Sequence, residues 1–297
     1  TDFSDTDSTT GVVTAANLTS AILTSADLSG QDLTNVDFEK ADLSGANLTG
    51  ATLTNAILTG AKLITDDGTS AGTVVMKGAI LTGAKLSKAD LTGADLSTNT
   101  VPDVDVVSNL VGADLTGAIL IGANLSDAIL VDDTVGSKGA NLEKADLTGA
   151  ILSDTVFSVT HSVTDVVTAT NLTSAILTSA DLNGRDLTNV DFEKADLSGA
   201  NLSGADLENA ILTGAKLITD GSTRNNGVTS DTSGTVNLST AILTNAKLSK
   251  ADLTGANLTS AKLMGADLTG AILTSTTLAS TDFSDTDSTT GVVTAAN

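Results

Sequence analysis

Apolar residues recur along this chain with a period of five. The segment Ala41-Asp42-Leu43 shows the repeat: a small residue, a polar residue and a Leu, which we call the centre. Two residues follow that are mostly Thr, Ser, Gly, Asn, Glu or Lys. A helix repeats every 3.6 residues and a strand every two. A strict period of five therefore indicates a chain that turns a corner every five residues.

The pattern closely resembles the pentapeptide-repeat family, whose motif is A-(D/N)-L-x-x. The resemblance covers about four-fifths of the chain, and dozens of matches stay in one frame. One internal check supports that frame, because every Phe of the chain falls on the centre position, namely Phe3, Phe38, Phe157, Phe192 and Phe283.

The resemblance implies an all-β fold, a right-handed quadrilateral β-helix in which four pentapeptides form one coil. The centre residue and the small residue two before it then point inward, and the residue just before the centre occupies an outward slot. Coils would stack about 4.8 Å apart through backbone hydrogen bonds. We expect burial of Leu142, Leu147, Leu197 and Leu202, and exposure of Asp146 and Lys216.

The repeat is interrupted by polar, Gly-rich and Asp-rich inserts, which we interpret as surface loops. The longest clean run, 140–219, would comprise sixteen pentapeptides, or four coils by the family's geometry. The opening of the first run is degenerate, with Ser8 and Val13 on centre positions. The repeat runs are 1–64, 79–98, 108–130, 140–219 and 236–297, and the inserts are 65–78, 99–107, 131–139 and 220–235.

Two longer repeats lie over the pentapeptides. Residues 17–63 match 171–217 with five differences, and residues 281–297 are identical to 1–17 at an offset of 280. The frame would join there, with Phe283 and Val293 leading to the equivalent of Leu18. We expect a long tandem array in which 281–297 restarts a 280-residue unit; a terminal duplication is the alternative.

Charge limits the partners of the chain. With 14 basic and 36 acidic residues, its net charge is −22. Nucleic acid and anionic membrane surfaces would be repelled, since binding them requires clustered Lys or Arg. No apolar run approaches the roughly 20 residues of a membrane span, so we expect no membrane insertion. The chain opens without an initiator Met, as a cut piece would, and a missing signal peptide is therefore uninformative.

Catalytic chemistry has little support in the sequence. There is no Cys, the Ser and Thr residues have no base beside them, and His161 is the single histidine, in an outward slot. Most carboxylates also occupy outward slots, where solubility and corner hydrogen bonds explain them. We expect no enzyme, no catalytic or cofactor-binding residue and no small-molecule substrate.

Calcium is the one cofactor that the sequence leaves open. Carboxylates gather in three segments, and Ca²⁺ takes such oxygen ligands. None of the segments matches a full calcium-loop signature, so solvated acidic turns are the other interpretation. Any bound calcium should lie in these segments and outside 140–219; they contain Asp2, Asp5, Asp7 and Gly11, Asp66, Asp67 and Gly68, and Asp132 and Asp133.

Ten Ala-Ile-Leu triplets place Ile in the outward slot. Exposed β-branched residues suit strands, and exposed apolar residues also favour lateral association. Both interpretations remain open for Ile22, Ile57, Ile80, Ile119, Ile129, Ile151, Ile176, Ile211, Ile242 and Ile272.

Together these features favour a structural protein over a binding module. We expect an extended rod or filament, extracellular or on the cell surface, that associates with itself head-to-tail or laterally. An acidic protein that mimics DNA, like the gyrase-protecting members of the family, is the alternative. The mixed outward column Asp2, Ile22, Asp42 and Lys62 weighs against it, because no continuous acidic row forms.

Overall fold

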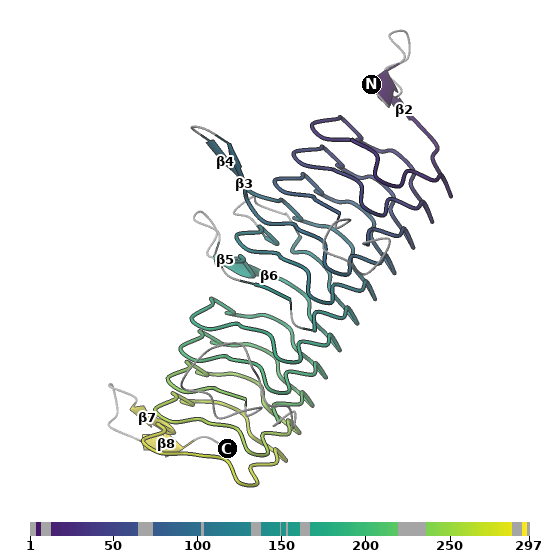
Figure 1. The fold of residues 1–297 in the computed structure, drawn as a ribbon. Coiled ribbons are helices and arrows are strands. Elements are labelled where there is room, and N and C mark those ends of the chain that lie inside the picture. Colours follow the sequence, from purple (N-terminus) through teal and green to yellow (C-terminus); the bar gives the residue numbers. More distant parts are fainter. Residues whose placement is uncertain are drawn as a thin grey trace.

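The computed structural model describes most of the chain as coils stacked along one axis (Figure 1). The first and last coils lie at opposite ends of this rod. The described residues are 4–6, 13–64, 74–101, 104–131, 138–148, 150–152, 154–160, 167–218, 236–286 and 293–295; within the strands at 4–6, 13–15, 284–286 and 293–295, and at 100, 101, 104, 105 and 160, only the backbone is described.

Four parallel ladders of single β-bridges run along the rod. Each bridge joins an outward slot to the one 20 residues later, or to a more distant one where an insert intervenes. The first ladder has eleven positions, which number the coils 1 to 11: Asn17, Asp37, Ile57, Lys85, Asp114, Asn141, Asn171, Asp191, Ile211, Lys247 and Asp267. The second ladder follows it by five residues in each coil, from Ile22 to Ile272, the third contains Asp27 to Ile151 and Asp181 to Thr277, and the fourth contains Asp32 to Val156 and Asp186 to Asp282.

Centre residues and the small residues two before them form one continuous core. Leu142, Leu147, Leu197 and Leu202 are fully buried, as expected. Phe38, Phe157 and Phe192 are the largest buried side chains, whereas Phe283 is only partly buried against the core. Each Leu removed from water stabilises the coil by roughly 1.5–3 kcal/mol.

The outward slot is less exposed than expected. Lys216 is exposed, but Asp146 is half-buried because its side chain folds back onto its own turn. Its Oδ1 accepts the backbone N–H of Thr148 at 3.0 Å and the hydroxyl of the same residue at 2.6 Å.

All five backbone N–H groups of a pentapeptide have an acceptor, as residues 41–45 illustrate. Two of them bond the next coil: Leu43 donates to the carbonyl of Lys62 at 2.8 Å, and Gly45 donates to that of Ile64 at 3.0 Å. Asp42 donates back to the preceding coil, and Ala41 closes the turn at 2.9 Å to the carbonyl of Phe38. The remaining N–H, of Ser44, donates to the Asp42 side chain at 3.0 Å. An Asp or Asn in the outward slot thus satisfies the donor that the ladders leave over.

The second residue after the centre turns the corner in the left-handed region of backbone conformation. Gly favours this region, and Gly117 adopts φ = 64° there. Residues with a side chain also occupy these corners, for example Asn55 at φ = 55° and Lys88 at φ = 58°.

Four antiparallel hairpins interrupt the stack. They pair β1 (Ser4–Thr6) with β2 (Val13–Ala15), β3 (Asn99–Val101) with β4 (Val104–Val106), β5 (Ser158–Thr160) with β6 (Val167–Ala169), and β7 (Ser284–Thr286) with β8 (Val293–Ala295). Three of them share one register, in which Ser4 pairs with Ala15, Ser158 with Ala169 and Ser284 with Ala295. The hairpin that opens the described chain therefore recurs after 154 and 280 residues.

The run of 140–219 is not clean, contrary to the sequence prediction. The hairpin β5–β6 leaves the coil after Phe157, and Thr170 closes the turn with its N–H 2.9 Å from the carbonyl of Phe157. This turn bond spans thirteen residues in place of three. The ten additional residues are two full periods, so the five-residue frame passed through them undisturbed.

Other predicted boundaries also need correction. The predicted insert 65–78 ends early: Val74 and Met76 are fully buried, and Val75 bridges Asn47 and Asp95 in the third ladder. The runs predicted at 1–64 and 236–297 include hairpins, so Val13 and Val293 lie in β2 and β8 and not at coil centres. The predicted insert 99–107 contains β3 and β4.

Replacing Phe192 by Ala tests the core. We expect a local loss of about 3–5 kcal/mol, because coils held by ladders on both sides cannot collapse into the space. The matched change Phe283→Ala, at the partly buried end of the stack, should cost clearly less. Amide hydrogen exchange of the surrounding coils measures both, and equal losses would contradict the assigned core.

Replacing Asp146 tests the side-chain cap. Asp146→Ala removes the acceptor of the Thr148 N–H and should cost about 0.5–1.5 kcal/mol. Asp146→Asn keeps an oxygen in place and should cost less. Urea unfolding compares the two variants, and an equal effect would mean that charge, and not the hydrogen bond, is what matters.

Candidate interaction surface

The outward slots supply the side chains from which a functional surface is built. Several of their carboxylates are held by hydrogen bonds that favour the charged form. The pKa of Asp42 lies below its ordinary value of 3.8, chiefly because the Ser44 hydroxyl donates to it, with Lys62 adding a smaller effect. Hydroxyl and backbone donors of Thr34 and Thr269 lower the pKa of Asp32 and Asp267 in the same way.

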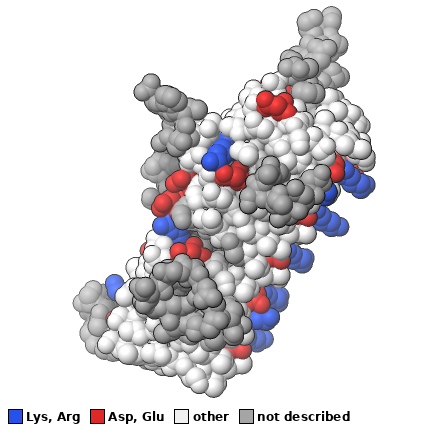
Figure 2. All heavy atoms as spheres, viewed as in Figure 1, with Lys and Arg blue, Asp and Glu red and all other residues white. Residues whose placement is uncertain are grey.

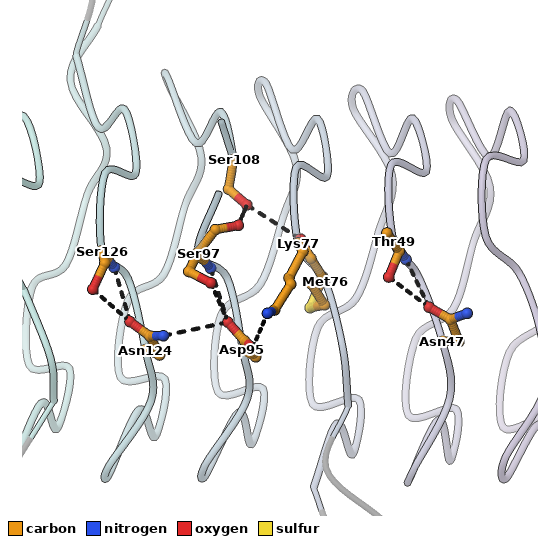
Figure 3. A network of polar contacts seen from close by, with 9 residues as sticks. All are labelled: Asn47, Thr49, Met76, Lys77, Asp95, Ser97, Ser108, Asn124 and Ser126. Atoms are coloured by element: carbon orange, nitrogen blue, oxygen red, sulfur yellow. Dashed lines mark hydrogen bonds and ion pairs between the residues drawn. The ribbon is translucent and has the colours of Figure 1, made fainter. Parts of the chain in front are cut away.

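Asparagines in the third ladder add hydrogen bonds between coils. Asn201 donates to Asp181 at 3.1 Å, and Asn257 donates to Asn237 at 3.2 Å. Figure 3 shows this side of the rod, where Asn124 approaches Asp95 and Lys77 lies 3.3 Å from the same carboxylate. The polar groups of the third ladder therefore serve largely to join coils.

One long edge of the rod has no insert. Residues 65–73 and 219–235 lie between the second and third ladders, β3–β4 lies between the third and fourth, and β5–β6 lies between the fourth and first. Between the first and second ladders the chain advances five residues in all eleven coils. We call this stretch, from the first-ladder residue to the second-ladder residue of each coil, the insert-free edge.

Lysines gather on the insert-free edge. It holds nine of the fourteen basic residues and twelve of the thirty-six acidic residues, a net charge of −3, so the rest of the chain carries −19. Figure 2 shows Lys and Arg side chains in a row along one long edge. The nine are Lys40, Lys62, Lys85, Lys88, Lys144, Lys194, Lys216, Lys247 and Lys250.

Five of these lysines occupy the corner itself, in every second coil. Lys40, Lys88, Lys144, Lys194 and Lys250 stand at coils 2, 4, 6, 8 and 10, all with φ between 57° and 59°. Their stems lie along the rod: a Cβ added to Gly117 would sit 4.0 Å from Cγ of Lys88, and one added to Gly60 3.7 Å from Cγ of Lys40. The sequence alone did not reveal this row, because insert lengths must be known to align the coils.

Three corner lysines pair with the Glu before them. The Nζ–Oε1 distances are 2.7 Å for Lys40–Glu39, 2.6 Å for Lys144–Glu143 and 2.5 Å for Lys194–Glu193. Hydrogen bonding to Glu39 and Glu193 raises the pKa of Lys40 and Lys194. Lys88 and Lys250 follow Ser, and neither makes an ion pair with any residue that the structure describes.

The predicted calcium segments are not tested. Asp2, Asp7 and Gly11, the segment 66–68, Asp132 and Asp133 lie outside the described residues, as does His161, and only the backbone of Asp5 is described. Among the described residues, no group of three His, Cys, Asp or Glu side chains is placed to hold a metal ion. No helix in the described part of the chain is long and apolar enough to cross a membrane.

The outward isoleucines divide into two groups. Six of the ten are exposed, from 37% to 81%: Ile22, Ile80, Ile119, Ile151, Ile176 and Ile272. The other four are half-buried. Four of the six exposed ones, Ile22, Ile119, Ile176 and Ile272, lie in the second ladder and so on the insert-free edge.

The lowered pKa values predict the response of stability to acid. A carboxyl whose pKa is lower folded than unfolded stabilises the fold above its unfolded pKa of about 3.9 and loses this contribution as pH falls through the folded pKa. Urea midpoints should stay level between about pH 7 and 5 and fall below about pH 4. Asp42→Asn should flatten part of that fall. Unchanged stability down to pH 2 would contradict these hydrogen bonds.

Comparison with known proteins identifies the repeat. A family model for pentapeptide repeats matches in eight copies, over residues 14–50, 32–64, 68–97, 108–132, 138–158, 175–214, 236–259 and 251–287. The comparison with curated proteins gave no match.

Solved structures of the same kind are similar to the chain. HetL, a pentapeptide repeat protein involved in heterocyst differentiation regulation from the cyanobacterium Nostoc sp. strain PCC 7120, is 32% identical over 89% of this chain and 87% of its own, with a TM-score of 0.51. QnrB1, a plasmid-mediated fluoroquinolone resistance protein, is 17% identical over 81% of this chain and 88% of its own, with a TM-score of 0.29. From its repeats and its similarity to HetL, the chain belongs to the pentapeptide-repeat family.

Proposed function

We propose that the protein is a non-catalytic structural rod that extends end to end into a filament, outside the cell or on its surface. The observation that carries this proposal is the state of the last coil. Its centre residues Leu273 and Leu278 are 36% and 41% exposed, whereas centre residues of the inner coils are almost completely buried. Apolar centres and unpaired strand edges of this kind favour continuation by a further coil.

The recurrent hairpin supports continuation in the same frame. Hairpin β1–β2 precedes the first ladder at Asn17, and β5–β6 separates the fourth ladder at Val156 from the first at Asn171. Hairpin β7–β8 follows the fourth ladder at Asp282, so the next first-ladder position would be Asn297. A unit of 280 residues thus joins its own copy without loss of register, covalently or by stacking.

The same proposal includes the finer course of the fold. HetL and the family resemblance support a right-handed quadrilateral β-helix, in which the four ladders mark the four sides. A head-to-tail contact of such units does not close on itself and grows into a fibre.

DNA mimicry receives less support. A DNA mimic needs continuous rows of negative charge, whereas the second ladder begins Ile22, Asp42, Lys62 and Asp90. The insert-free edge as a whole carries only −3 of the net charge of −22.

Sizing and electron microscopy of the chain test the proposal. We expect particles whose length grows with concentration in multiples of one rod while their width stays constant. The double change Leu273→Lys and Leu278→Lys places charge on the last coil and should leave single rods. Ile151→Lys, at an exposed outward slot away from the ends, is the control and should still grow. Single rods at all concentrations, from a gene that encodes only one unit, would contradict the filament.

A further inference from the structure

The insert-free edge repeats itself after six coils. Its six-residue stretches in coils 1 to 5 are identical to those in coils 7 to 11, although inserts of different length lie between them. The stretches are NLTSAI at 17–22 and 171–176, DFEKAD at 37–42 and 191–196, ILTGAK at 57–62 and 211–216, KLSKAD at 85–90 and 247–252, and DLTGAI at 114–119 and 267–272.

The opposite edge, between the third and fourth ladders, does not repeat in this way. DLSGQD at 27–32 becomes DLNGRD at 181–186, and NLTGAT at 47–52 becomes NLSGAD at 201–206. NLSDAI at 124–129 becomes TLASTD at 277–282. Both edges cover the same core, so packing does not explain why one edge alone repeats without change. The repeated feature is the exposed chemistry of the insert-free edge.

This chemistry alternates in sign along the rod. Coils 2 and 8 carry a net charge of −2 on the edge, and coils 3, 4, 9 and 10 carry +1 each. Coils 5, 6 and 11 carry −1, and coils 1 and 7 are neutral with an exposed Ile in the second ladder. A partner that matches the edge must repeat every six coils, or about 29 Å.

We propose that the insert-free edge binds the same edge of a second copy of this chain, antiparallel, with a two-fold axis at coil 6. A second copy has the required six-coil repeat by construction. The two-fold axis places coil 2 opposite coil 10 and coil 4 opposite coil 8, so acidic coils face basic ones.

Individual residues match in this arrangement. In the first ladder, Asp37 faces Lys247 of the second copy, and Lys85 faces Asp191. At the corner, Lys88 faces Glu193; by symmetry Lys250 faces Glu39, so the two corner lysines without an ion pair gain one. In the second ladder, aspartates of the two copies meet beside these lysines, which offset their repulsion.

Exposed isoleucines match as well. The axis at coil 6 brings Ile22 to Ile272 of the second copy and Ile119 to Ile176. These side chains are 81%, 48%, 37% and 38% exposed in the single rod. A parallel pair in register would instead oppose every acidic coil to itself, and like charges at close range disfavour it.

The edge is large enough for a specific contact. Eleven coils span about 50 Å. A contact about 16 Å wide along that length covers the roughly 800 Å² per partner of a standard interface. Because the rest of the chain carries −19, other orientations bring more strongly repelling surfaces together. This lateral pairing involves the side of the rod and does not depend on end-to-end growth.

Charge reversal with matched controls tests the pairing. The first variant combines Lys88→Glu with Lys250→Glu, and the second combines Glu39→Lys with Glu193→Lys. The control combines Lys77→Glu with Lys262→Glu, which changes the net charge as much as the first variant but lies in the third and fourth ladders. Sedimentation equilibrium at low salt measures association, X-ray scattering measures the cross-section of the rod, and circular dichroism checks that each variant is folded.

The wild-type chain should form pairs with an increased cross-section that dissociate as salt rises. Each edge variant alone should pair at least about tenfold more weakly, and an equimolar mixture of the two should recover pairing, since their charges are exchanged. The control should pair within about twofold of wild type. A wild-type cross-section of a single rod at high concentration, or equal weakening in the control, would overturn the proposal. Growth in length alone would support end-to-end stacking without lateral pairing.

Discussion

Complete pairing of the backbone N–H groups is the constraint on which the coil depends. In residues 41–45, three N–H groups bond neighbouring coils, one closes the turn, and one reaches the Asp42 side chain. Buried or half-buried donors without an acceptor are costly. The motif follows from this need: a small residue fits the tight turn, Asp or Asn caps it, and Leu fills the axis.

The same constraint explains where the chain tolerates change. Inserts leave at corners, where a turn bond spans more residues while the ladders on either side stay intact, as from Phe157 to Thr170. Lys or Ile in the outward slot gives up the side-chain cap but keeps the ladder bonds. The outside of the coil is therefore free to carry charge patterns, and the insert-free edge uses this freedom in an ordered way.

The family and the core followed directly from the five-residue period, because each coil repeats one solution. The prediction failed where a departure kept or disguised that period. Hairpin β5–β6 adds ten residues, two periods, and so left the frame intact. Residues 74–78 were assigned to an insert because Val and Met replace the Ala and Leu of the motif, although both are fully buried. Asp146 proved half-buried because the motif does not show that the side chain caps its own turn.

The corner lysines needed the structure for a different reason. Their alternation between coils becomes visible only when coils separated by 27 to 36 residues are aligned with those separated by 20. Once they are aligned, the lysine row and the identical six-residue stretches lie on one edge, which separates the part of the surface that joins coils from the part available to a partner.

Residue-resolved amide hydrogen exchange tests the pairing of the backbone most directly. In inner coils with Asp or Asn in the outward slot, four N–H groups of each pentapeptide bond backbone carbonyls and one bonds a side chain at the surface. We expect protection with a period of five, in which the residue after the centre, such as Ser44, exchanges fastest. Protection without this period, or fastest exchange at the centre residues, would contradict the account.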